Sequence, residues 1–180
     1  AIEGSIETRL VQREATEKDG FIEGIVSDDF VKAGVFERHK RTGKHALCFI
    51  EGLGLKGCSV AQTISHDSHN IIVVGDNDKD MEIAVNRVIS LGGGIVVVSK
   101  HKIVSEIGLP IAGLMSYEDY SDTILKLDKL ESAIGEYKKY KGSNIFTTLS
   151  FMSLPVIPEV KITAKGLYEF HRGSFISLYC

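Results

Sequence analysis

The chain has 180 residues, of which 43% are hydrophobic and 25% are charged, and these values are typical of one globular domain. Such a composition excludes a disordered chain, and a formal net charge of -3 spread along the sequence gives no support to a nucleic-acid-binding surface. No apolar run reaches the roughly 18 residues of a membrane-spanning helix. Three cysteines without a close pair or a C-x-x-C motif fit a reducing compartment, so we expect a cytoplasmic protein without a membrane or nucleic-acid partner.

We treat residues 1–180 as a single domain, in which residues 1–20 are the least regular part. A short strand is predicted over 7–11, and Asp19-Gly20 predicts a turn into a strand over 21–26. Unbroken β-branched runs are typical of strands covered on both faces. The apolar runs that predict further strands cover 33–37, 46–50, 59–64, 70–75, 95–98, 161–163 and 174–178, and the stretch 154–158 is expected to be irregular.

A first helix is predicted over 78–91 from the 3.6-residue period of its apolar side chains. Asp76 or Asp78 is expected to cap its start, and Gly92-Gly93-Gly94 to end it, because glycine adopts the left-handed conformation that closes helices. The predicted apolar stripe contains Met81, Ala84, Val85, Val88 and Ile89.

A second helix is predicted over 117–138, where Ser116 and Asp119 resemble a capping box. Its helical period is carried by Tyr120, Ile124, Leu127, Leu130 or Glu131, and Ile134.

The strand at 70–75, the helix at 78–91 and the strand at 95–98 form a predicted β-α-β unit. Such a unit predicts that its two strands are parallel, as neighbours or near neighbours in one sheet. The earlier strands are joined by short turns and are expected to be antiparallel. The predicted fold class is therefore α/β in its α+β variant, with a mixed β-sheet and packed helices.

The densest polar cluster is His66-Asp67-Ser68-His69-Asn70, directly before the apolar strand at 71–74. Its side chains suit acid–base chemistry, metal binding or hydrogen bonding to a substrate, but a polar turn bonded to nearby backbone explains them as well. The H-x-x-H spacing lacks a visible third ligand, so we predict no metal site in this chain. The cluster is expected where the strand begins, with part of it accessible to solvent.

A second candidate group, Glu37-Arg38-His39, closes the strand at 33–37. Arginine beside glutamate can orient an anion or pair across an interface, although a solvated strand end is the simpler interpretation. Residues 76–80 lack the glycine and late glutamate of a calcium loop, and Gly92-Gly93-Gly94 follows a helix where phosphate-binding loops precede one. We therefore predict no bound cofactor.

Several segments, in the same order, resemble the C-terminal region of microbial adenine deaminases, enzymes of the amidohydrolase superfamily. The resemblance covers roughly residues 20–170 and departs at Ser99-Lys100-His101-Lys102, where the family pattern leads us to expect a glycine-bearing turn. The matching segments are 35–39 with 42–43, 52–57, 66–71, 73–75, 80–81, 92–94, 109–116 and 149–158.

The resemblance implies an intact enzyme that converts adenine and water to hypoxanthine and ammonia. It also implies an upstream barrel holding a divalent metal, manganese or iron, to which residues 1–20 would be the linker, and a possible homo-oligomer. This chain would cover or assist the barrel without being catalytic alone. Candidate pocket or interface residues are His66, Asp67, His69, Asn70, Glu37, Arg38 and His39.

Two other functions stay open at this point. One is an independent regulatory module that binds a purine or another small ligand. The other is a stand-alone hydrolase that uses His66 and His69.

Overall fold

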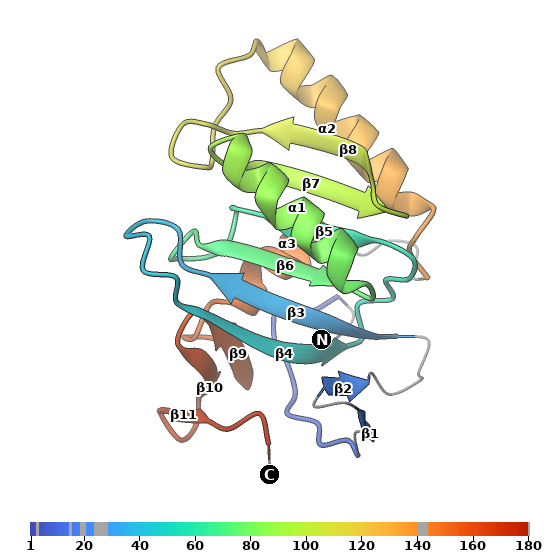
Figure 1. Ribbon diagram of the computed structural model, residues 1–180. Coiled ribbons are helices and arrows are strands. Elements are labelled where there is room, and N and C mark those ends of the chain that lie inside the picture. The colour runs from blue at the N-terminus through green and yellow to red at the C-terminus, as the bar shows by residue number, and fades with distance from the viewer. Residues whose placement is uncertain (3, 15, 19–20, 24–28, 140–143, 180) are drawn as a thin grey trace.

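The computed structural model describes residues 1–2, 4–14, 16–18, 21–23, 29–139 and 144–179, and the predicted Asp19-Gly20 turn lies outside these residues. Its centre is a six-stranded sheet in the order β4-β3-β6-β5-β7-β8 (Figure 1). The strands of this sheet are β3 (Phe30–Phe36), β4 (His45–Glu51), β5 (Ser59–Gln62), β6 (Ile71–Gly75), β7 (Gly94–Ser99) and β8 (Lys102–Gly108).

The remaining elements are two small sheets and three helices. The small strands are β1 (Thr16–Lys18), β2 (Phe21–Glu23), β9 (Val160–Thr163), β10 (Gly166–Glu169) and β11 (Ser174–Ile176). The helices are α1 (Asp78–Ser90), α2 (Tyr120–Gly135) and α3 (Ile145–Met152). Among the described residues, no helix is both long and apolar enough to cross a membrane.

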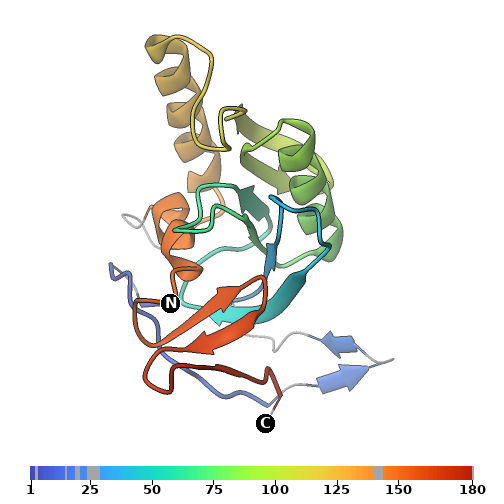
Figure 2. The ribbon, with the colours of Figure 1, turned by 90° about the vertical axis from the view of Figure 1, so that its left-hand side faces the viewer.

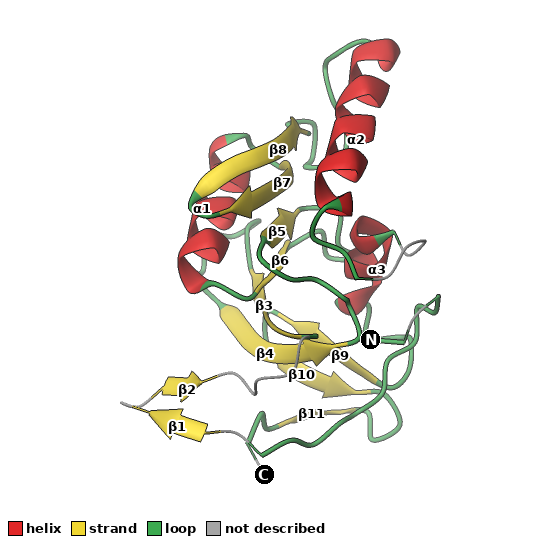
Figure 3. Cartoon of the chain, turned by 90° about the vertical axis from the view of Figure 1, so that its right-hand side faces the viewer, coloured by secondary structure: helices red, strands yellow, loops and turns green. Residues whose placement is uncertain are grey.

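Both faces of the central sheet are covered. Helix α1 packs on one face, and α2, α3 and the β9 sheet lie toward the other (Figure 3). In β6 the side chains alternate, because Ile71 and Val73 join the core under α1 while Ile72 and Val74 join the larger opposite core. This two-sided burial explains the unbroken apolar run and confirms the α+β class.

Strands β6 and β7 run parallel to each other, as the β-α-β pattern predicts, but they are not adjacent. Strand β5 lies between them and is antiparallel to both. The crossover through α1 therefore spans a strand that comes earlier in the chain, and the hydrogen-bonded pairs of the described sheets are antiparallel.

Helix α1 has the predicted bounds to within one residue, but its cap and its stripe differ from the prediction. Asn77 is the cap, and its side chain accepts a hydrogen bond from the Asp80 backbone N–H at 3.0 Å. Val88 is fully buried, whereas Ile89 is 59% exposed because it lies at the edge of the helix face that meets the sheet.

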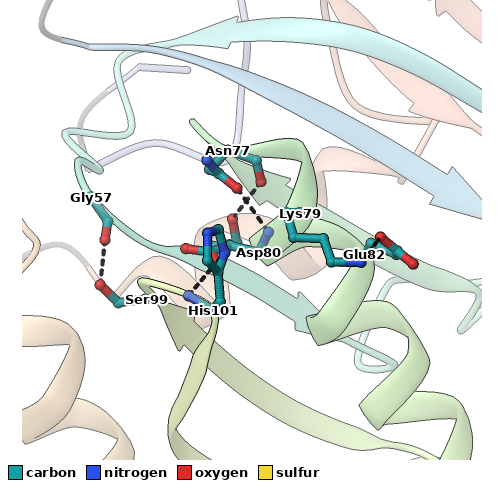
Figure 4. Close-up of polar contacts among 8 residues, drawn as sticks. Gly57, Asn77, Lys79, Asp80, Glu82, Ser99 and His101 are labelled. Atoms are coloured by element: carbon teal, nitrogen blue, oxygen red, sulfur yellow. Dashed lines mark hydrogen bonds and ion pairs between the residues drawn. The ribbon is translucent and has the colours of Figure 1, made fainter.

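A tight turn joins β7 to β8 without the glycine expected there. Lys100 and His101 both have positive φ, 50° and 63°, a conformation that favours glycine. Buried Asp80 holds this turn from α1, because its carboxylate accepts from the His101 backbone N–H at 2.7 Å and lies 2.8 Å from His101 Nδ1 (Figure 4). Figure 4 also shows Ser99 donating to the Gly57 carbonyl at 2.7 Å.

Other predicted elements change more. The predicted strand over 7–11 is wrong: Thr8 instead exchanges backbone hydrogen bonds with Pro158 and Glu159 without forming a strand. The predicted capping box at Ser116 is also wrong, because its hydroxyl accepts from Glu118 and the Asp119 side chain caps nothing. Strands β1, β8 and β10 and helix α3 have no counterpart among the predicted elements.

Candidate functional site

Four loops meet at one edge of the central sheet, where β3 and β5 end and β6 and β7 begin. Figure 2 turns this edge, the left-hand side of Figure 1, toward the viewer. We call it the loop edge, and it consists of residues 37–44, 63–70, 91–93 and 109–116, with the C-terminal end of α3 beside it. Most of the segments that resemble the adenine deaminase family therefore come together in space.

Arg38 joins three parts of this edge. Its backbone N–H donates to the Asn70 side chain at 3.3 Å, and its Nε donates to the His69 carbonyl at 2.6 Å. Its Nη2 donates to the Ala112 carbonyl at 2.5 Å. Both acceptor residues have positive φ, 49° at His69 and 57° at Ala112, so one guanidinium holds two sharply bent loops.

Thr63 also holds the 109–116 loop. Its hydroxyl donates to the Gly113 carbonyl at 2.6 Å and accepts from the Gly94 N–H at 2.9 Å. Gly113 has φ +77°, and a Cβ there would collide with the Arg38 guanidinium and crowd Thr63. Only glycine lets the 109–116 loop lie this close to both side chains.

Helix α3 supports the polar cluster from the other side. The His66 backbone N–H donates to the Ser150 carbonyl at 2.7 Å, and the Ser153 hydroxyl donates to the His66 carbonyl at 3.2 Å. The Ser65 and Ser153 hydroxyls also bond each other in the interior. The cluster therefore begins on a buried, hydrogen-bonded base.

The rings of the two histidines of the cluster meet edge to face, with centroids 5.7 Å apart. The His66 ring also packs on the Phe151 ring, with centroids 4.9 Å apart. Burial lowers the pKa of His69, and the neighbouring His66 lowers it further. The Ser65 backbone N–H points at the His69 Nδ1 over a long 3.4 Å, and a ring hydrogen bond to the Thr63 backbone raises the pKa in the opposite direction. The lowering of the pKa favours the neutral ring at neutral pH.

The outward part of the cluster is available to a partner or ligand. Asp67 and Ser68 are exposed, and His66 and His69 are half-buried. Among the described residues, the Asp67 carboxylate and the His66 ring nitrogens form no hydrogen bond. Asn70 is buried and engaged by Arg38, so it supports the loop from inside.

The Glu37-Arg38-His39 group divides in its roles. Glu37 accepts from the Lys40 N–H at 2.7 Å and the Thr42 N–H at 3.0 Å, and these bonds lower its pKa to about 2. Glu37 therefore closes its own loop and does not join Arg38. His39 Nε2 donates to the Ser68 carbonyl at 2.6 Å, which connects this loop to the polar cluster.

The side chains at the loop edge do not provide a complete set of metal ligands. In the described part of the chain, no three His, Cys, Asp or Glu side chains lie together in a ligand arrangement. His66 and His69 supply two nitrogens, whereas protein zinc sites use at least three protein ligands. We therefore assign no metal ion to these residues.

A groove of about 1000 Å³ lies away from the loop edge, between β4, the β9 sheet and the segment at 8–13. Its wall is mostly apolar, and its residues Arg13 and Arg172 are paired with Glu51 and Glu169. The loop edge is the better candidate, because the Asp67 carboxylate and the His66 ring form no hydrogen bond among the described residues and lie on a hydrogen-bonded base.

Sequence reasoning did not find the residues beneath the cluster. Thr63 bonds Gly113, 50 residues later, and Ser65 bonds Ser153, 88 residues later, so spacing carries no signal for these contacts. Gln62 is fully buried and donates to the Ile64 and Phe146 carbonyls, while its Oε1 has no partner among the described atoms. The polar residues concerned are Gln62, Thr63, Ser65, Ser150 and Ser153.

Comparison with known proteins gives one consistent result. Residues 5–174 match the family model described as the adenine deaminase C-terminal domain. The chain is 44% identical to an adenine deaminase of Thermosipho melanesiensis over 86% of its length, and 39% identical to those of Thermosipho africanus over 98% and Staphylothermus marinus over 97%. It spans only 26% to 30% of the length of these relatives. The chain therefore belongs to the adenine deaminase C-terminal domain family.

Proposed function

We propose that this chain is the C-terminal part of an enzyme that hydrolyses adenine to hypoxanthine and ammonia. Water adds at C6 of the purine, the exocyclic C–N bond breaks, and the amine leaves as ammonia. Support comes from the family match and from relatives that are named adenine deaminases and are more than three times as long. The catalytic steps belong in this proposal to the preceding region of the polypeptide.

The proposal includes an amidohydrolase barrel upstream, with manganese or iron as its metal and residues 1–20 as the linker to this single domain. A metal of this kind lowers the pKa of bound water and so supplies the nucleophile. The proposal also includes a cytoplasmic location, supported by the unpaired, buried Cys48 and Cys58, and contacts between subunits in a homo-oligomer.

Within the intact enzyme, we assign the loop edge to the surface that faces the barrel. The observation that carries this assignment is the exposed Asp67 carboxylate beside the half-buried His66 and His69, on a base tied down by Arg38 and α3. A neutral His69 ring can form a hydrogen bond with a purine nitrogen, and Asp67 can accept from a purine N–H. These groups would orient adenine or order the entrance to its pocket.

The test uses the intact enzyme with Asp67→Asn and His69→Ala. Loss of an orienting contact is expected to lower kcat/KM for adenine by about 10-fold or more, with an unchanged melting temperature. Glu82→Gln, on the outer side of α1, is the control and should keep wild-type kinetics. Wild-type kcat/KM in both variants with earlier melting would assign the cluster a purely structural role.

A further inference from the structure

The apolar stripe of α2 is fully covered only in its C-terminal half, where Leu130 is fully buried and Ile134 is 3% exposed. The helix packs on β8 and β7, and Ile124, in its N-terminal half, is half-buried. In the N-terminal half, Tyr120 is 82% exposed and Leu127 is 40% exposed, although they lie on the same side of the helix as the buried pair. The helix extends past the edge of the sheet at its N-terminal end (Figures 1 and 2).

The segment leading into α2 is exposed and apolar as well. Leu114 is 36% exposed, Met115 is 55% exposed and Tyr117 is 79% exposed. Scattered apolar residues are normal on protein surfaces, but six large exposed ones within fourteen residues of chain, two of them on the helical stripe, are typical of a contact surface. We call Leu114, Met115, Tyr117, Tyr120 and Leu127 the α2 patch.

We propose that the α2 patch is covered by the region that precedes this domain in the same polypeptide. More than two thirds of the length of the relatives lies outside the segment that matches this chain, and the matching domain is C-terminal, so a large body must lie against this domain or be tethered to it. Interfaces between domains of one chain bury roughly 600–1,500 Å².

The size of the patch favours a tethered partner over a second copy. A stable complex of separate proteins uses about 20–30 residues on each side, far more than this patch offers. A partner on the same polypeptide is present at an effective concentration in the millimolar range, so a small apolar surface is enough to hold it.

The position of the patch along the chain points to the same partner. The 109–113 loop is held by Arg38 and Thr63, and the patch begins at the next residue, Leu114. A body lying on the loop edge would therefore reach the patch along one continuous stretch of chain. The inference rests on family membership and not on adenine as the substrate.

The experiment measures cysteine labelling in the intact polypeptide. Leu127→Cys is compared with Ile89→Cys, because Ile89 is an exposed apolar residue on α1, away from the patch. Burial raises the pKa of Cys48 and Cys58 to about 12, so their thiols react slowly, and both variants carry Cys180→Ser so that the introduced cysteine is the reactive one in this domain. We expect maleimide to label position 127 at least tenfold more slowly than position 89, at every protein concentration.

Three outcomes would overturn the proposal. One is equal labelling of the two positions, and another is protection that disappears on dilution as the molecular mass falls, which would assign the patch to a second copy. If the cysteine variants do not fold, amide hydrogen exchange is measured on the unmodified intact protein. Rapid exchange over residues 117–127 is then the third outcome that would overturn the proposal. Ammonia release from adenine is measured separately, so an inactive but protected protein would count only against the proposed function.

Discussion

Arg38 Nη2 donates to the carbonyl of Ala112, 74 residues later in the chain, at a distance of 2.5 Å. The same guanidinium donates through Nε to His69, so one side chain holds two loops that the backbone alone would leave separate. Because the bond to the His69 carbonyl is part-buried, the loss of this cation leaves that carbonyl without its partner.

Arg38→Lys is expected to destabilise the chain by about 1–3 kcal/mol, because an ammonium cannot reproduce the planar fork that reaches both carbonyls. Chemical denaturation measures the change. Arg13→Lys is the control, since Arg13 pairs with Glu51 through solvent-exposed hydrogen bonds and should lose much less. Equal losses in the two variants would show that the clamp adds nothing beyond a surface ion pair.

Val88→Gln is expected to cost at least about 2 kcal/mol of unfolding free energy, because it places an amide without partners in the core under α1. Ile89→Gln, one residue later and 59% exposed, should change stability by less than about 0.5 kcal/mol. The two midpoints of urea unfolding give the comparison. A small loss at Val88 would mean that α1 does not pack as described.

Glu37 should make stability depend on acid pH. Its carboxylate accepts hydrogen bonds from Thr42 and Lys40, which lower its pKa from 4.5 to about 2 in the folded chain. A lowered folded pKa contributes stability above pH 4.5, and this contribution is lost as the pH falls through about 2. Glu37→Gln is therefore expected to be less stable than wild type at pH 6, with the difference shrinking toward pH 2. A difference that stays constant over this range would contradict the bonding of Glu37 to its loop.

After dialysis, the 180-residue chain is expected to hold no stoichiometric manganese, iron or zinc. The reason is the ligand set: among the described residues, no third ligating side chain is placed to bind one metal ion together with His66 and His69. Elemental analysis of the dialysed protein checks this directly. A stoichiometric metal that disappears in His66→Ala would place a metal site in this domain and contradict the prediction.

Local pattern was sufficient for the elements whose burial repeats at a fixed period. Helix α1 and strands β6 and β7 were predictable because an apolar side chain every 3.6 residues, or in an unbroken β-branched run, has few other ways to be buried. The polar cluster at 66–70 was visible for the same reason, since polar groups directly before a buried strand must lie at its end.

Only the tertiary structure decided which distant segments meet. Strand β5 lies between β6 and β7. Asp80 of α1 holds the β7–β8 turn, which lacks the expected glycine, and Arg38 bonds Ala112 over a separation that no local spacing encodes. The periodic stripe of α2 shows the limit most directly: its period predicts a helix with an apolar side, but whether each half is covered depends on the length of the sheet beneath it. Periodicity determines which side of an element is apolar, whereas coverage is a property of the surfaces that the rest of the chain brings to it.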